Sequence, residues 1–119
     1  MKNSKFIYIV LIVIDISLLL FCGYFFITKD RQAPVISFSE NETLYFEGID
    51  EHELLKGTGA FDKKDGDVSS RVVVEKIIFD AESMQATVYY AVSDHSGNVA
   101  KASRVFDTSE SIKVKNENN

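Results

Sequence analysis

An apolar run from residue 6 to residue 27 constrains this chain more than any other feature of its sequence. An α-helix of that length measures roughly 33 Å, which is enough to cross a bilayer core of about 30 Å. Lys2 and Lys5 stand before the run, as they would before a signal peptide or a signal anchor. The sequence therefore predicts a transmembrane helix over 6–27.

The run matches an uncleaved anchor better than a removable signal peptide. A cleavable signal has a shorter apolar core, of roughly 7–15 residues, and then small residues at a cleavage site. Here the core continues through Phe21 and Phe25 without such a site. Cys22 raises the alternative of a lipid-modified cysteine, but Phe21 occupies the position where that processing needs a small residue. We expect the helix to be retained.

Charge favours one orientation of the anchor only slightly, because Lys2 and Lys5 on one side oppose Lys29 and Arg31 on the other. Residues 1–5 are too few to form a domain, so we expect them to stay in the cytoplasm. The remaining parts are expected outside the cell: a linker over 28–32, one small domain over 33–108 and a polar tail over 109–119.

The exported part is acidic and lacks cysteine. From Thr28 onward it carries 11 Lys and Arg against 17 Asp and Glu, a net charge of −6. This charge argues against nucleic acid and against docking on anionic lipid, so the only membrane contact expected is that of the anchor. Cys22 lies inside the apolar run, so the core must stabilise the domain without disulfides. A small exported domain without disulfides favours a bacterial surface protein.

After the apolar run the helical period disappears and short strands are expected. The clearest strand is 86–93, in which Ala86, Val88, Tyr90 and Val92 share one face. Further strands are predicted over 35–38, 43–46, 71–79 and 99–106, with turns at 57–59, 65–67, 80–83 and 96–98. Residues 51–56 fit either a helical turn or an irregular strand. The pattern predicts an all-β fold, an antiparallel β-sandwich.

Two motifs carry a family resemblance. Residues 57–71, GTGAFDKKDGDVSSR, contain the pattern A-x-D-x-x-D-G-D-hydrophobic-S, and residues 86–100, ATVYYAVSDHSGNVA, contain Y-x-V-x-D-x-x-G-N-x-A. Together with Ala33-Pro-Val-Ile and Arg104-Val-Phe, this ordered set resembles bacterial surface immunoglobulin-like domains of the pesticidal-crystal-protein type. The resemblance implies an immunoglobulin-like sandwich that serves as a spacer or adhesive module. Such domains usually carry a glycine near 81–85, where this chain has none.

The acidic residues of these motifs have two interpretations. In the first, they accept backbone hydrogen bonds in tight turns, and Gly66 supplies the positive φ that such a turn needs. In the second, the two loops converge on a calcium ion, for which the candidate ligands are Asp62, Asp65, Asp67, Asp94 and Asn98. Their spacing is not that of an EF-hand. No other cofactor is expected.

Residue types for catalysis are scarce. Asp94, His95 and Ser96 are triad residues, but neighbours in sequence point in different directions and cannot form a nucleophile–base–orienter chain by themselves. His52 lies between two glutamates in a polar segment. We therefore expect a non-catalytic protein.

Asp15 interrupts the centre of the apolar run. A central aspartate costs about 2.5–3.5 kcal/mol on insertion scales, and intramembrane acids usually face a partner or a cavity. Tyr8, Asp15 and Cys22 are spaced by seven, which places them on nearly one stripe of a helix. Asp15 is thus either a tolerated imperfection in a plain anchor or part of a helix–helix contact that joins this chain into an oligomer.

The sequence predicts a membrane-anchored, extracytoplasmic immunoglobulin-like domain that acts in surface interaction, adhesion or scaffolding. Its partner would be a protein or a surface glycan. The alternative is a small accessory subunit of a membrane complex, in which the transmembrane helix and its Asp15 are the functional element.

Overall fold

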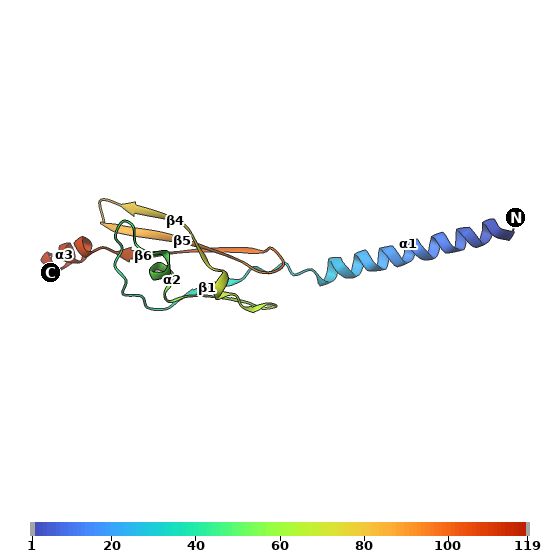
Figure 1. Ribbon diagram of the computed structural model, residues 1–119, viewed down its shortest axis with the longest axis horizontal. Coiled ribbons are helices and arrows are strands. Elements are labelled where there is room, and N and C mark those ends of the chain that lie inside the picture. Colours follow the sequence, from blue (N-terminus) through green and yellow to red (C-terminus); the bar gives the residue numbers. More distant parts are fainter. Residues whose placement is uncertain (1, 119) are drawn as a thin grey trace. The chain divides into compact units, whose positions relative to one another are not determined.

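The computed structural model describes residues 2–118 and divides the chain into two compact units. The first unit ends at Asp30 and consists of helix α1, Lys2–Thr28. The second unit begins at Arg31 and holds every strand (Figure 1).

Helix α1 confirms the helix predicted over 6–27 and extends it at both ends. Its sequence has no proline, and its large apolar side chains, from Phe6 to Ile27, are exposed on all sides. Within the described residues it is the one helix long and apolar enough to cross a membrane, which fits either an anchor or a signal sequence. The helix ends where the Thr28 hydroxyl donates to the Tyr24 carbonyl at 2.8 Å.

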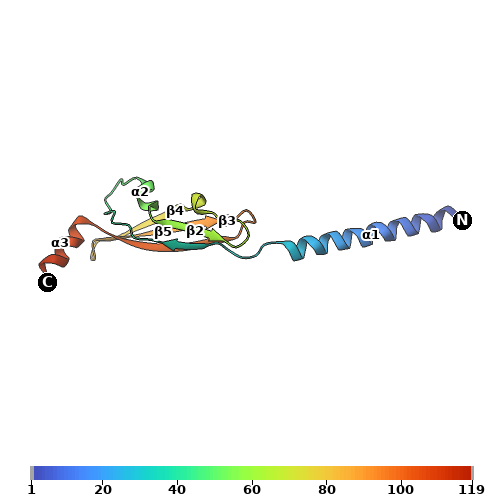
Figure 2. The same ribbon diagram turned by 90° about the horizontal axis from the view of Figure 1, so that it is seen from below.

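The second unit is a β-sandwich, which confirms the predicted fold class. Two antiparallel sheets of three strands each form its layers (Figures 1 and 2). One sheet has the order β1-β2-β3, with β1 at Val35–Phe38, β2 at Thr58–Asp62 and β3 at Gly66–Asp67. The other has the order β4-β5-β6, with β4 at Val73–Asp80, β5 at Gln85–Ser93 and β6 at Val99–Asp107.

The alternation predicted for residues 86–93 is confirmed and builds one side of the core. The four side chains of the predicted face are each no more than 2% exposed, and they are Ala86, Val88, Tyr90 and Val92. Phe106 of β6 is buried beside them. Successive strand residues point to opposite faces of a sheet, so this register directs one apolar face of β5 toward the opposite layer.

Helix α2, Glu51–Leu55, resolves the open interpretation of residues 51–56 in favour of a helical turn. Asp50 caps it by accepting a hydrogen bond from the His52 backbone at 3.0 Å. Leu54 is fully buried in the core, and its carbonyl accepts a hydrogen bond of 2.7 Å from the Tyr90 hydroxyl. Burial raises the pKa of Tyr90. This bond ties α2 to the central strand of the second sheet.

Two predictions for the segment between β1 and β2 were wrong. Residues 43–46 form no strand, because the Asn41 side chain turns the chain there by accepting from the Thr43 backbone and donating to the Lys56 carbonyl. The Tyr45 backbone N–H donates to the Asp107 carbonyl at 2.9 Å, which connects this segment to the end of β6. The turn predicted at 57–59 is limited to Gly57, with φ at +71°, since β2 already begins at Thr58.

Two other boundaries differ from prediction. Strand β4 begins two residues later than expected, because Ser69–Arg71 forms a 3₁₀ turn in which the Arg71 backbone donates to the Val68 carbonyl. The segment predicted as a polar tail contains helix α3, Ser109–Glu117. That segment lacks glycine and proline, and its Lys and Glu residues favour a helix locally.

The β4–β5 turn shows how this chain manages without the glycine that the resemblance leads one to expect. Met84 takes the left-handed conformation there, with φ at +53°. Asp80 supports the turn by accepting from the Glu82 backbone at 2.9 Å and from the Ser83 hydroxyl at 2.8 Å. The Thr108 hydroxyl donates a hydrogen bond of 2.7 Å to the Met84 carbonyl. These bonds offset the strain that a side chain brings to this conformation.

Candidate functional site

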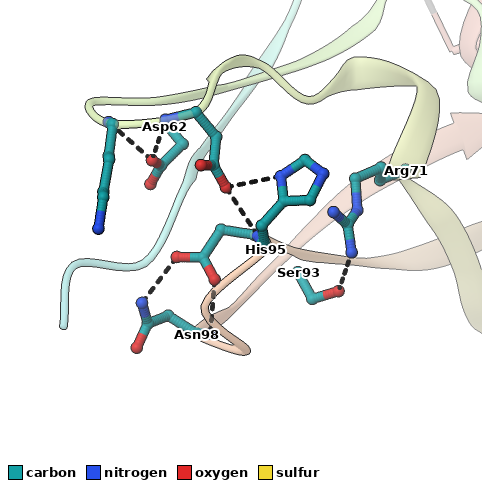
Figure 3. Close-up of polar contacts among 8 residues, drawn as sticks. Asp62, Arg71, Ser93, His95 and Asn98 are labelled. Atoms are coloured by element: carbon teal, nitrogen blue, oxygen red, sulfur yellow. Dashed lines mark hydrogen bonds and ion pairs between the residues drawn. The ribbon is translucent and has the colours of Figure 1, made fainter. Parts of the chain in front are cut away.

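Two loops from different sheets meet at one end of the sandwich. The first joins β2 to β3 and carries Asp62 and Asp65, and the second joins β5 to β6 and carries Asp94, His95 and Asn98. One Asp65 oxygen accepts hydrogen bonds from the His95 backbone at 2.7 Å and from His95 Nδ1 at 2.9 Å. Figure 3 shows this contact and the turns around it. The convergence on which the calcium interpretation depends is therefore present.

Asp62 stands at the end of β2 and is only 1% exposed. Its Oδ1 accepts backbone hydrogen bonds from Lys64 at 2.8 Å and from Asp65 at 2.9 Å, which fixes the turn. Its Oδ2 is buried and accepts no hydrogen bond within the part of the chain that the structure describes. A buried polar atom without a partner is uncommon in a folded protein and calls for an explanation.

Asp94 follows β5 and is 2% exposed. Its carboxylate accepts from the Asn98 backbone at 2.8 Å and from the Asn98 side-chain amide at 2.7 Å. Burial raises the pKa of Asp94, but the hydrogen bonds from Asn98 and from the Ser96 backbone together outweigh that effect and leave the pKa lowered. The hydrogen bond from the His95 backbone is the largest cause of the lowered pKa of Asp65. Hydrogen bonding thus favours the charged form of both carboxylates.

The structure brings together most of the predicted ligand residues. An oxygen of Asp62 and one of Asp94 lie within 4.8 Å of each other. Asp65 accepts a hydrogen bond from His95 of the other loop, and Asn98 donates one to Asp94 within its own loop. Asp67 lies apart from them: it is exposed on β3 and accepts from the Ser69 backbone at 2.9 Å. The turn interpretation is confirmed by these bonds, and calcium binding stays a prediction.

The residues considered for catalysis do not form a triad in the described contacts. The His95 ring is directed to Asp65 and not to its sequence neighbours Asp94 and Ser96, and its side chain is 73% exposed. His52 is exposed on α2. Tyr8, Asp15 and Cys22 are all exposed on α1, so the proposed helix contact stays a prediction.

An aromatic hollow that the sequence interpretation missed lies at the opposite end of the sandwich. It has a volume of about 480 Å³ and is lined by Tyr45, Phe46, Glu47, Phe79, Thr108, Ser109 and Glu110. The Tyr45 and Phe79 rings stack with centroids 6.3 Å apart. We call this hollow the aromatic pocket. The sequence signal was present in the Tyr45-Phe46 pair, which was assigned to a strand instead.

Comparison with known proteins gives one similar structure. No protein-family model matches the chain, and no curated protein matches it. A solved structure described as "The structure of CBM51-2 in complex with GlcNAc and INT domains from Clostridium perfringens ZmpB" is 30% identical, at a TM-score of 0.45, over 63% of this chain and 16% of that one. A likeness at this TM-score carries no argument about function, and the crystal-protein type of the resemblance stays a prediction.

Proposed function

We propose that this chain is a membrane-anchored domain, presented outside the cell, that binds a surface ligand without catalysis. The observation that carries the binding role is the aromatic pocket, because it combines stacked rings with hydrogen-bonding groups in a hollow of about 480 Å³. Pockets of roughly 300–1,000 Å³ with apolar walls and a few placed polar groups are typical ligand sites.

The anchor is supported by the energetics of helix α1. Its apolar run contains sixteen Leu, Ile, Val and Phe residues, each of which favours insertion by about 0.3–0.6 kcal/mol when central. Their sum exceeds the cost of about 2.5–3.5 kcal/mol for one central aspartate, so Asp15 does not prevent insertion. The large apolar side chains are exposed along the whole helix, as a helix surrounded by lipid requires.

Protease protection tests the anchor and its orientation. In bacterial spheroplasts that express the full chain with a tag at each end, external protease should remove the carboxyl-terminal tag and spare the amino-terminal one. The reason is that α1 retains the short amino-terminal segment inside while the sandwich lies outside. A cytoplasmic marker that stays intact is the control. A mature protein that begins at or after Cys22 would overturn the anchor, and a protected sandwich would overturn the orientation.

The lining of the aromatic pocket favours a sugar as the ligand. Tyr45 and Phe79 offer flat apolar faces, onto which the C–H face of a pyranose ring can pack. Glu47 and Glu110 offer carboxylate oxygens, and Thr108 offers a hydroxyl, for hydrogen bonds with sugar hydroxyls. An uncharged, hydroxyl-rich ligand also suits a domain whose net charge is negative.

Sugar binding is tested with two phenylalanines that are exposed to the same extent. Phe46 in the aromatic pocket and Phe61 on β2 are each 62% exposed. We expect the full chain in nanodiscs to bind an N-acetylated or a neutral β-linked disaccharide by calorimetry. Phe46→Ala should weaken this binding at least about tenfold, equivalent to about 1.4 kcal/mol. Phe61→Ala should leave it unchanged. Equal affinities of the two variants, or no heat with either sugar, would contradict the proposal.

A further inference from the structure

The buried pair of carboxylates at the loop end of the sandwich lacks a positive partner in the described contacts. Asp62 and Asp94 are each at least 98% buried, and their nearest oxygens lie within 4.8 Å. Two like charges at this separation repel each other strongly when water is excluded. The groups that donate to Asp94 are the Asn98 backbone and the Asn98 side-chain amide, neither of which carries a positive charge, so they do not neutralise the pair.

The orphaned oxygen of Asp62 is an independent indication that something is bound there. Its partner oxygen is saturated by the two backbone donors of the turn, whereas Asp62 Oδ2 is buried and accepts nothing from the described residues. In Figure 3 the Asp62 carboxylate lies above the loop that carries Asn98, with its second oxygen directed toward that loop. A cation between the two loops would provide a partner for this oxygen and would also offset the repulsion between the Asp62 and Asp94 carboxylates.

We propose that Asp62 and Asp94 bind one calcium ion. Calcium takes oxygen ligands at about 2.3–2.6 Å, so two ligands of one ion lie at most roughly 5 Å apart, which the observed separation fits. Both proposed ligands are carboxylates, and neither is a thiol or an imidazole. This donor set suits a hard cation rather than zinc or copper. Asp65 and Asn98 act as positioning residues, because they hold the two loops and the Asp94 carboxylate in place.

The consequence of binding is a bridge between the two sheets. Asp62 belongs to the end of β2 in one sheet and Asp94 follows β5 in the other. An ion held by both residues joins the layers at a point where the chain has no disulfide to do so. Because the site is assembled in the folded state alone, calcium should stabilise that state by mass action.

Thermal unfolding with and without calcium tests the site. Full-length protein in nonionic detergent is first freed of metal with EDTA and then measured in about 10 mM CaCl₂. With a Kd of about 0.1–1 mM, as in extracellular modules, the folded-to-unfolded ratio should rise about 10- to 100-fold and the Tm by several degrees. Calorimetry on the same protein should find one site. Absence of binding heat, or an equal Tm shift with MgCl₂, would overturn the proposal.

The Asp62→Asn variant separates the effect of Asp62 on calcium binding from its effect on the turn. The asparagine oxygen can still accept from Lys64 and Asp65, so the turn is kept while the charge is lost. We expect this variant to be at least as stable as the parent in EDTA and to show no calcium shift. Asp67→Asn, the same change at an exposed carboxylate of β3, should keep the full shift. If Asp62→Asn fails to fold, Asp94→Asn must lose the calorimetric binding heat, and a retained shift in either variant would refute the site.

Discussion

Replacing Leu54 with alanine is expected to lower the free energy of unfolding of the sandwich domain by about 2–5 kcal/mol. Leu54 is fully buried on α2, which contacts β4, and its side chain belongs to the hydrophobic core of the domain. Truncation removes buried methyl groups and leaves a cavity that the surrounding strands can fill only in part. Whole domains are commonly stable by only about 5–15 kcal/mol, so the variant should lie close to its unfolding transition at growth temperature.

Leu55→Ala is the matched control for this prediction. Leu55 is the next residue of the same helix and is only half-buried, so the change in helix propensity is the same and the change in burial is smaller. Urea unfolding of the full chain in detergent, followed by the near-ultraviolet circular dichroism of tyrosine, gives both values. Equal losses for the two variants would show that the core is not centred on Leu54.

Removing the Tyr90 hydroxyl is expected to cost about 1–3 kcal/mol, although Tyr90→Phe keeps the ring and therefore most of the buried area. The hydroxyl donates to the Leu54 carbonyl at 2.7 Å inside the core, where water cannot replace it. The ring itself packs against Phe38, with centroids 5.4 Å apart, and phenylalanine preserves that contact. The loss should therefore report the hydrogen bond rather than a cavity.

Tyr89→Phe is the control on the opposite face of the same strand. Tyr89 is half-buried, and its ring lies 4.4 Å from the Lys76 ammonium, an interaction that phenylalanine can keep. We expect a change within about 0.5 kcal/mol, as for most surface substitutions. The same urea experiment measures it. A Tyr90→Phe loss no larger than that of Tyr89→Phe would mean that the Leu54 carbonyl finds another donor.

Local pattern predicted the parts of this fold in which one physical effect dominates. The alternation of β5 was readable because each inward residue from Ala86 to Val92 is apolar, and helix α1 was readable because Asp15 is the one charged residue in its apolar run. The prediction of a strand at 43–46 was wrong because β propensity describes how well side chains fit a half-buried surface. Here Asn41 redirects the segment instead, by hydrogen bonds to the Glu53 and Lys56 carbonyls farther along the chain.

The candidate sites were only partly readable for a related reason. The motifs marked the acidic segments that carry Asp62 and Asp94, and the calcium interpretation required that the two loops converge. Sequence could not show that these two are buried while Asp67 is exposed, because burial depends on how the two sheets pack. The aromatic pocket was invisible for the same reason, since Tyr45 and Phe79 meet through tertiary structure alone.

The direction of the strands determines how this domain responds to pulling. The chain enters the sandwich at Val35, which pairs with Phe61 beside the acidic loops, and leaves β6 at Asp107, which pairs with Gln85 at the other end. Tension between these two points therefore runs along the strands. Ladder hydrogen bonds lie perpendicular to antiparallel strands, so such tension shears many of them at once instead of opening them one by one. The sandwich is thereby arranged to resist tension between Val35 and Asp107 without unfolding readily.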